Sequence, residues 1–284
     1  MILIDFSNVI VGSIMIAHKV PDEERFSEDF IRHLVLNSIR AYRTKYKQKY
    51  GEIVICTDFH SSWRKNVFPN YKAHRKVARE KQKKEGLDWS ALFDTISRII
   101  EEIDTYFPYK VVRVPHAEGD DVIAVLSKTF KEKSLIISSD KDFSQLYKYK
   151  WVRQFSPMKH KMLNGIDPNE YLKEHIIRGD KGDGIPNILS DDDCIVNGVR
   201  QKPISKKKVA NWIVQDPSEF NDDMKRGWLR NKILIDFDLI PKDISDAILK
   251  QYNEEKKYQQ GQLMNYFIKN RLKYLMENMG DFTR

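Results

Sequence analysis

The sequence predicts an α/β protein: a mostly parallel central sheet flanked by helices, followed by a smaller all-helical lobe. Short apolar runs with the length of buried strands alternate with helical patterns as far as about residue 160. After about residue 165 the strand signal fades while the helical patterns continue. Strands that alternate with helices are typical of a parallel sheet covered on both faces. We therefore expect one domain over 1–160 and a helical domain over 161–284.

Four short runs supply the predicted strands. Residues 2–4 (ILI), 53–56 (IVIC) and 135–138 (LIIS) are almost wholly apolar, as strands buried on both faces are. Residues 110–114 (KVVRV) alternate more between polar and apolar side chains. These four runs are the predicted strands of the sheet.

Helical patterns fill the segments between and after these strands. Over 27–46 the apolar side chains recur at helical spacing behind Ser27, a residue type that caps helix N-termini, and 88–107 repeats the pattern behind Asp88. The second half of the chain has further helical patterns over 166–179, 205–214, 244–255 and 262–279.

Composition indicates a folded protein with a basic surface. Hydrophobic residues make up 41% of the chain and charged residues 32%, and the net charge is +8. That charge fits a polyanionic partner, although many soluble basic proteins share it. The two cysteines, Cys56 and Cys194, suit a reducing cytoplasm and form no metal-binding spacing. We expect neither a signal peptide nor a membrane span, because Asp5 interrupts the apolar N-terminus and no apolar window is long enough.

Carboxylates follow the predicted strands, at the point where each strand ends. Residues just past the carboxyl ends of parallel strands gather in one crevice of an open α/β sheet. The helix predicted to start near residue 118 adds three more carboxylates at the same edge. We therefore expect seven carboxylates to converge: Asp5, Asp58, Glu118, Asp120, Asp121, Asp140 and Asp142.

A divalent cation would resolve the repulsion within this set. A single aspartate at a strand end is more often a helix cap or a turn former. Seven together would repel one another and raise their pKa values, unless cations neutralise them. With no His or Cys in the set, the oxygen ligands favour Mg²⁺, with Mn²⁺ as a substitute, over zinc. So rich a cluster suggests two ions, the arrangement used for in-line attack on phosphodiesters.

A Gly-rich turn over 178–187 (RGDKGDGIPN) adds Asp180 and Asp183. These two residues either serve the turn itself or reach back to complete the metal site. Their spacing alone leaves both interpretations open.

Two basic segments are candidates for nucleic-acid binding. Residues 64–85 contain nine Lys or Arg and two Glu, and they follow directly after Asp58. A run of charge is usually a solvated surface, but a positive arm beside a metal site suits an enzyme that acts on a phosphate backbone. Within this arm, Tyr71 could stack on a base of a single strand. The second segment, Lys206, Lys207 and Lys208, opens a predicted helix, where it holds duplex phosphates or is a solvated helix end.

Together these features resemble the flap endonuclease family of 5′ nucleases, including its bacteriophage members. The resemblance covers nearly the whole chain and depends on several short motifs in order. These are LIDFS (3–7), RHLVLNSI (32–39), WRK…YKAHRK (63–76), EGDD (118–121), LIISSDKDFSQL (135–146), QFSPM (154–158), RGDKGD (178–183) and LIDFDLIP (234–241).

The resemblance implies a role for each candidate residue. It implies that Asp183 joins the seven strand-end carboxylates as a metal ligand, with Asp180 in the outer shell. It implies an arch at about 60–87 that carries Tyr71, with Lys72 and Arg75 steering the scissile phosphate. Nearby phosphates would be held by Arg64, Lys65 and Lys76. The residues with implied catalytic roles are Lys72, Arg75, Asp5, Asp58, Asp121 and Asp140.

One segment departs from the family pattern. The family usually has a Gly-rich hairpin after its GD motif, which binds duplex DNA and often a potassium ion. Here residues 187–210 intervene. We therefore expect duplex binding through the lysines of that region, and the potassium site is left open.

The expected function is that of a Mg²⁺-dependent 5′ nuclease with two ions. Its substrates would be branched, nicked or flapped duplex DNA and RNA–DNA hybrid, and its task the removal of primers from lagging-strand fragments. For a phage member, we expect the protein to act in the host cytoplasm. It would act as a monomer, beside a replication single-strand-binding protein and a sliding clamp. Two alternatives stay open: a PIN-like ribonuclease, which would lack the long arm and the helical lobe, and a non-catalytic nucleic-acid-binding protein.

Overall fold

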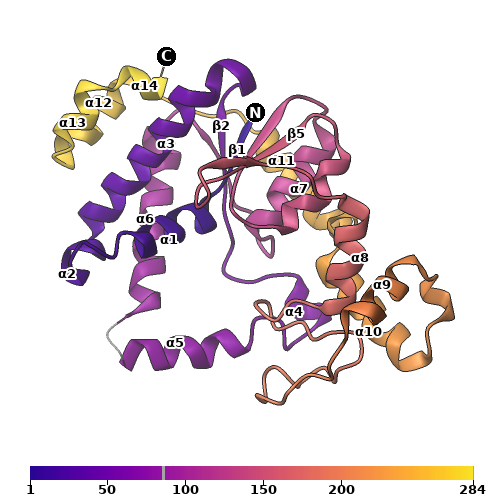
Figure 1. Cartoon of the computed structure of the whole chain (residues 1–284). Helices are drawn as coiled ribbons and strands as arrows, with labels where there is room; N and C mark the ends of the chain where they lie inside the picture. The colour runs from indigo at the N-terminus through magenta and orange to yellow at the C-terminus, as the bar shows by residue number, and fades with distance from the viewer. Residues whose placement is uncertain (85–86, 284) are drawn as a thin grey trace.

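The computed structural model describes residues 1–84 and 87–283 and has a six-stranded sheet at its centre (Figure 1). The strand order is β3-β2-β1-β4-β5-β6, and every neighbouring pair is parallel except β5 and β6. The strands are β1 Ile2–Asp5, β2 Ile53–Cys56, β3 Lys110–Val112, β4 Ser134–Ile137, β5 Val152–Ser156 and β6 Lys161–Leu163. The predicted α/β class and its mostly parallel sheet are confirmed.

The alternation of side chains along the strands divides the core in two. On β1, Ile2 and Ile4 point to one face and Leu3 to the other, and all three are buried. The first face is covered by α1 (Phe6–Ile16), α3 (Glu28–Tyr50) and α6 (Trp89–Tyr106). The second face is covered by α7 (Gly119–Thr129) and α11 (Lys242–Asn253). Continuous apolar strands therefore mark burial on both faces, as the sequence indicated.

The N-terminal caps account for where the main helices begin. The hydroxyl of Ser27 accepts a hydrogen bond from the backbone N–H of Phe30, and the carboxylate of Asp88 accepts from Ser90 and Ala91. Asp167 caps α8 (Pro168–Arg178) in the same way. The starts behind Ser27 and Asp88 were predicted from the cap residue and the apolar stripe that follows it.

The helical lobe has a core of its own. The lobe consists of α8, α9 (Lys206–Val214) and α10 (Asp222–Ile235), and these helices pack around a core that includes Ile177 and Trp228. Phe68 and Tyr71 from the arch lie in this same core, so the arch is anchored on the helical lobe. The arch contains α4 (Arg64–Val67) and α5 (His74–Lys84), and its end at 85–86 lies outside the described residues.

The end of the chain differs from the predicted domain division. Figure 1 shows α12 (Gln260–Lys269), α13 (Lys273–Glu277) and α14 (Gly280–Thr283) beside α3, on the far side of the sheet from α8–α10. Leu263, Phe267 and Phe282 belong to the core of the sheet, and β6 extends that sheet past residue 160. The separate lobe is therefore shorter than 161–284. An apolar stripe predicts that a helix packs, but not which surface it packs against.

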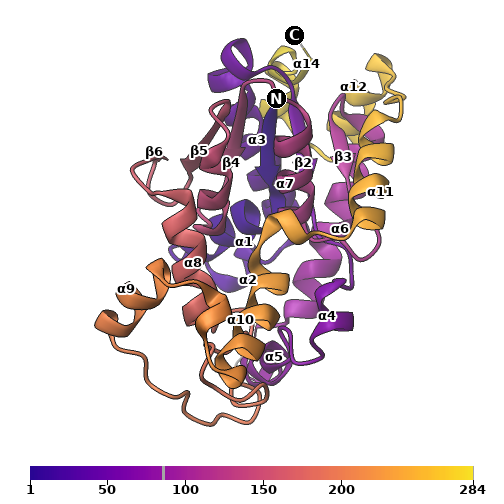
Figure 2. The ribbon, with the colours of Figure 1, turned by 90° about the vertical axis from the view of Figure 1, so that its right-hand side faces the viewer.

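Short elements complete the chain, and Figure 2 shows α11 running along the sheet toward the C-terminal helices. The remaining elements are the helix α2 (Asp22–Arg25) and the 3₁₀ turns η1 (Asp142–Lys148), η2 (Pro217–Glu219) and η3 (Phe237–Leu239). Within 1–84 and 87–283, no helix combines the length and the apolar character that a membrane crossing requires.

Candidate functional site

The carboxyl ends of the parallel strands bring the predicted acidic residues together. Asp5 ends β1, is only 5% exposed, and accepts hydrogen bonds from the Ser138 hydroxyl (2.7 Å) and the backbone N–H of Asn8 (3.3 Å). Asp58 follows β2 and accepts from the N–H of Gly119 (2.7 Å), which ties that strand end to the start of α7. The central strands of the sheet thus present their last side chains to one edge, as expected at a switch point in strand order.

These side chains disturb one another's ionisation. Burial, with the nearby charges of Asp58 and Asp140, raises the pKa of Asp5 to about 7. Burial and the neighbouring Asp142 raise the pKa of Asp140 to about 6. The pKa of Asp120 is raised well above its usual range by desolvation and by Asp5 and Asp140. We call the convergent set the carboxylate cluster: Asp5, Asp58, Glu118, Asp120, Asp140, Asp142, Asp180 and Asp183. Such crowding fits a site built for cations.

Asp121 lies apart from this cluster, although the sequence suggested it as a metal ligand and catalytic residue. It is fully buried, and its two carboxylate oxygens accept hydrogen bonds from Arg64 (2.8 and 3.0 Å). It also accepts from the indole N–H of Trp63 (3.1 Å) and the N–H of Glu118 (3.0 Å), which closes a capping box at the start of α7. Its position three residues after the N-cap turns it toward the protein interior. Asp121 is therefore a structural residue here.

Arg64 and Tyr71 are likewise buried, so two predicted contacts with nucleic acid are corrected. Arg64 is 4% exposed and donates to Glu118 and Asp121 and to the carbonyl oxygen of Leu234. Tyr71 is 2% exposed, and its hydroxyl lies 2.8 Å from Glu118 and 2.7 Å from Asp183. Neither side chain is therefore available for a phosphate or a base. The basic and aromatic pattern of the segment did not indicate the acidic partners that bury these two side chains.

Glu118 is the carboxylate that the arch holds most firmly. Its oxygens accept hydrogen bonds from the Ser62 hydroxyl (3.1 Å) and from Arg64 (2.9 Å), and the Lys72 ammonium contacts it directly. Burial alone would raise its pKa, but the charges of Lys72 and Arg64 lower the pKa to about 2. Glu118 is therefore ionised at neutral pH.

Lys72 and Arg75, the predicted phosphate-steering cations, both reach the carboxylate cluster. The Lys72 ammonium lies 3.6 Å from Asp183 in addition to its contact with Glu118, and the Arg75 guanidinium pairs with Asp183. Arg75 also donates to the carbonyl oxygen of Gly182 (3.0 Å). The base of the arch is thus bound to the acidic turn of the helical lobe.

That acidic turn depends on a glycine. Asp180 and Asp183 lie between Gly179 and Gly184, and the Asp183 N–H donates to Asp180 (3.1 Å). Gly179 has φ +66°, and a Cβ there would lie 2.4 Å from the carbonyl oxygens of Ile185 and Pro186. The turn therefore folds back tightly enough to bring both aspartates to the carboxylate cluster. Of the two interpretations left open by spacing, the geometry favours the second.

His175 was missed by the sequence prediction, which counted no histidine in the metal site. It lies in the last turn of α8, with its Nε2 3.6 Å from Asp142 and 3.7 Å from Asp180. These three residues can each offer one ligand atom, with all three atoms within 4.8 Å of one another. A single histidine carries no spacing signature, and its only signal was its place in the helical turn before RGDKGD.

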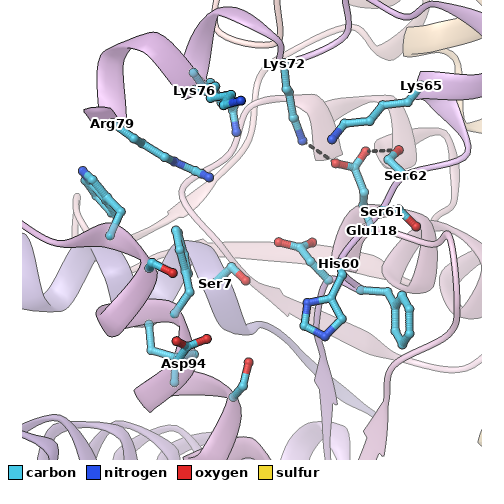
Figure 3. Close-up of a pocket in the computed structure, with 18 of the residues that line it drawn as sticks. Ser7, His60, Ser61, Ser62, Lys65, Lys72, Lys76, Arg79, Asp94 and Glu118 are labelled. Atoms are coloured by element: carbon cyan, nitrogen blue, oxygen red, sulfur yellow. Dashed lines mark hydrogen bonds and ion pairs between the residues drawn. The ribbon is translucent and has the colours of Figure 1, made fainter. Parts of the chain in front are cut away.

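A cavity of about 900 Å³ lies between the arch and the sheet (Figure 3). Asp58, Glu118 and Lys72 line one part of it, and the stacked rings of Trp89 and Phe93 line another. In Figure 3 Lys65, Lys76 and Arg79 of the arch lie on one side of this space, opposite Ser7 and Asp94, and the Lys72 ammonium is directed at Glu118. The basic side chains that line the cavity are Lys65, Lys72, Arg75, Lys76, Arg79, Lys83 and Arg113.

The three lysines of the second basic segment are exposed. Lys206, Lys207 and Lys208 form the first turn of α9, which Ser205 caps. Their ammonium groups and the helix N-terminus face solvent together.

Comparisons with known proteins agree with this architecture. Residues 13–175 match the family described as "5′-3′ exonuclease, N-terminal resolvase-like domain", and residues 168–282 match "T4 RNase H, C terminal". The ribonuclease H of Enterobacteria phage T4 is 34% identical over 295 aligned residues, which cover 99% of this chain and 95% of that protein. The flap endonuclease Xni of Shewanella sp. (strain MR-4) is 33% identical over 138 residues, 45% of this chain and 48% of that protein.

Solved structures confirm the fold. A bacteriophage T5 protein co-crystallised with metal ions superposes with a TM-score of 0.60 at 19% identity, covering 88% of this chain and 96% of that one. The T5 flap endonuclease in a pseudo-enzyme-product complex with DNA and metal ions gives a TM-score of 0.60 at 19% identity, covering 89% and 99%. The family match over residues 13–175 and the full-length match to T4 ribonuclease H show that this chain belongs to the 5′-3′ exonuclease family of phosphodiester hydrolases.

Proposed function

We propose that this chain is a divalent-metal-dependent 5′ nuclease that cuts the 5′ ends and flaps of duplex DNA and RNA–DNA hybrid. The observation that carries the proposal is the carboxylate cluster, which lies beneath two cations of the arch, Lys72 and Arg75. A non-catalytic binding protein would gain nothing from so many crowded carboxylates, which destabilise the metal-free fold. A PIN-like ribonuclease would need neither the arch nor the helical lobe.

The donor set fits divalent cations with a preference for oxygen. Ligands offered by Asp5, Asp58, Asp120 and Asp140 would hold one cation, and those of Asp142, Asp180 and Asp183 a second, with Glu118 at the edge of both. We propose Mg²⁺ as the resident ion and Mn²⁺ as a substitute. Bound cations supply Lewis-acid stabilisation of the charge on the scissile phosphate and activation of the attacking water. Asp121 is left out of the ligand set, because Arg64 already neutralises it.

Lys72 and Arg75 are proposed to offset the negative charge that builds on the phosphate. Both side chains are anchored at a defined distance from the carboxylate cluster by their ion pairs with Glu118 and Asp183. A phosphate that enters the site meets preorganised cations, whose interaction strengthens as the charge develops. No side chain of the described residues need act as a general base for this chemistry.

The substrate backbone is proposed to follow two basic surfaces. A single-stranded 5′ segment would lie in the arch cavity, with Lys65, Lys76 and Arg79 near its phosphates and Trp89 and Phe93 available for stacking. Duplex DNA would be held by the lysines of α9 in the helical lobe. We keep the proposal that the helical part is a duplex-binding domain, and assign that role to α8–α10.

The biological setting is proposed from the relatives. Because the T4 relative is named a ribonuclease H, we extend the proposal to removal of RNA primers during DNA replication. The protein would act as a monomer in the cytoplasm of the host, beside a single-strand-binding protein and a sliding clamp.

A nuclease assay tests the proposal. Nicked, flapped and RNA-primed duplexes with a 5′ label are incubated with and without Mg²⁺, and short 5′ products are expected only with the metal. An Asp140→Asn, Asp142→Asn double variant should be inactive, whereas Asp246→Asn, an exposed aspartate of α11, should be as active as the wild type. Full activity of the double variant would contradict the proposal.

A further inference from the structure

His175 has a ring nitrogen that is buried without a hydrogen-bond partner. Its Nε2 contacts no solvent and accepts or donates no hydrogen bond within the described residues. The nearest acidic atoms are Asp142 Oδ1 at 3.6 Å and Asp180 Oδ2 at 3.7 Å, both beyond the roughly 3.2 Å limit of a good hydrogen bond. The nitrogen therefore faces the gap between two carboxylates instead of binding either one.

The ring is also held in this orientation from one side. Tyr171, one turn earlier on α8, stacks on His175 with ring centroids 5.6 Å apart and planes 11° apart. The Tyr171 hydroxyl donates to Asp142 (2.8 Å), so the same tyrosine positions two of the three groups. If His175 only filled space, there would be no need to fix the orientation of a ring whose Nε2 has no hydrogen-bond partner.

The three atoms are spaced as ligands of one ion. Metal–nitrogen and metal–oxygen bonds of about 2.1 Å to atoms 3.6–3.7 Å apart subtend roughly 118–124° at the ion. That angle suits a tetrahedral or distorted higher-coordinate site with further positions for water or substrate. A small cavity lined by His175, Asp142, Asp180 and Asp183 lies at this point.

We propose that His175 is a nitrogen ligand in the second cation site and shifts the preference of that site from Mg²⁺ toward transition metals. This inference rests on the proposed function, which supplies the cation. Imidazole binds Co²⁺ and Zn²⁺ well and Mn²⁺ more weakly, whereas Mg²⁺ prefers oxygen and keeps its waters. The first site has only oxygen ligands and accepts Mg²⁺. The two sites therefore differ in preference, so a mixed Mg²⁺/Mn²⁺ enzyme is expected when both ions are present.

Pulsed electron paramagnetic resonance of Mn²⁺ bound to the full chain tests this assignment. The wild type should show coupling between Mn²⁺ and a ¹⁴N nucleus, and protein labelled with ¹⁵N-histidine should show the ¹⁵N pattern instead. The His175→Gln variant should lose the coupling, and its affinity for one Mn²⁺ should fall about 10-fold or more, while its Mg²⁺ affinity changes less than about 3-fold. His60→Gln, the histidine nearest to Asp58 in sequence, should keep the coupling.

Several results would overturn the assignment. These are absence of nitrogen coupling in the wild type, its persistence in His175→Gln, its loss in His60→Gln, or an equal loss of Mn²⁺ and Mg²⁺ affinity. If His175→Gln does not fold, the labelled wild type still tests the assignment, because absence of histidine coupling there overturns it. Because the readout is spectroscopic, it is separate from the proposed function, which the cleavage assay with 5′-labelled duplexes tests.

Discussion

Arg64 and Asp121 form a buried two-point ion pair that joins the arch to the start of α7. Arg64 Nη2 lies 2.8 Å from Asp121 Oδ1, and Nη1 lies 3.0 Å from Oδ2. The same guanidinium donates through Nε to Leu234 near the end of α10 (2.8 Å). One side chain thus connects the arch, the sheet lobe and the helical lobe. Its charge serves the fold, although its place in a basic run suggested a phosphate contact.

Replacing Arg64 with alanine should destabilise the protein by about 3–5 kcal/mol, because Asp121 would remain buried without its partner. Lys65→Ala is the matched control, since Lys65 is the next residue and is exposed. It should leave the free energy of unfolding unchanged and weaken substrate binding only. Urea denaturation followed by circular dichroism measures both variants. Equal stability of Arg64→Ala and the wild type would show that the pair is not a structural link.

Replacing Lys72 with alanine should lower kcat about 10²–10³-fold, the usual cost of removing one preorganised group from a developing negative charge. Lys76→Ala, one turn further along the arch and exposed, should lower kcat much less. Single-turnover cleavage of a flapped duplex in saturating Mg²⁺ separates the effect on chemistry from that on binding. A loss seen only in KM would instead assign Lys72 to substrate binding.

The sequence predicted the sheet well, because its signals are local. Apolar runs of strand length, an acidic residue after each run and a cap before each helix are all properties of neighbouring residues. These signals located Asp5, Asp58 and Asp140 at one edge of the sheet without any knowledge of long-range contacts. Strand β5 was missed, since Arg153 and Gln154 interrupt its apolar pattern.

What the sequence could not predict depends on contacts between distant residues. Asp121 and Asp120 are neighbours, and no local pattern shows that Trp63 and Arg64 bind Asp121 and keep it out of the carboxylate cluster. His175 lies beside the carboxylate cluster because α8 ends there, and no local sequence pattern indicates that position. The C-terminal helices were placed in the helical domain without a packing surface for the same reason, because their apolar stripes fit any apolar face.

Gly179→Ala should destabilise the acidic turn and reduce nuclease activity, because the added Cβ would clash with two carbonyl oxygens. Gly165→Ala is a matched control: its φ is +78°, but a Cβ there meets nothing within 4 Å. The control should cost only the roughly 1–2 kcal/mol of a left-handed alanine and keep its activity. Thermal unfolding and cleavage rates of the two variants show whether the loss in Gly179→Ala comes from the positive φ or from the clash of the Cβ. Equal losses of stability and activity in both variants would mean that the clash does not contribute.

Replacing Lys206, Lys207 and Lys208 together with alanine should weaken duplex binding and reduce the salt dependence of the binding constant. If each lysine contacts one phosphate, the slope of log K against log salt should fall in magnitude by about 3. The control replaces three exposed lysines on or beside the C-terminal helices, Lys257, Lys269 and Lys273, which changes net charge equally. Fluorescence anisotropy at several salt concentrations measures both. The same change in slope for both variants would mean that net charge, and not α9, binds the duplex.

The metal-free protein should lose stability as pH rises from about 4 to about 7. The pKa of Asp5 is raised to about 7 and that of Asp140 to about 6, from an ordinary value of 3.8. Between these values the folded chain keeps protons that the unfolded chain has already released, so the free energy of unfolding falls as pH increases. Glu118 acts in the opposite direction but only at lower pH, because its pKa is lowered to about 2.

Urea denaturation in EDTA at pH 5 and pH 7.5 measures this slope, and saturating Mg²⁺ should abolish it, because bound cations favour the ionised carboxylates. Asp140→Asn should be more stable than the wild type at pH 7.5 without metal, whereas Asp246→Asn should follow the wild type at both pH values. Greater stability of the metal-free wild type at pH 7.5 than at pH 5 would contradict the raised pKa values. The carboxylate cluster would then not lower the free energy of unfolding of the metal-free protein at neutral pH. Its crowding would no longer be a reason to propose that cations bind there.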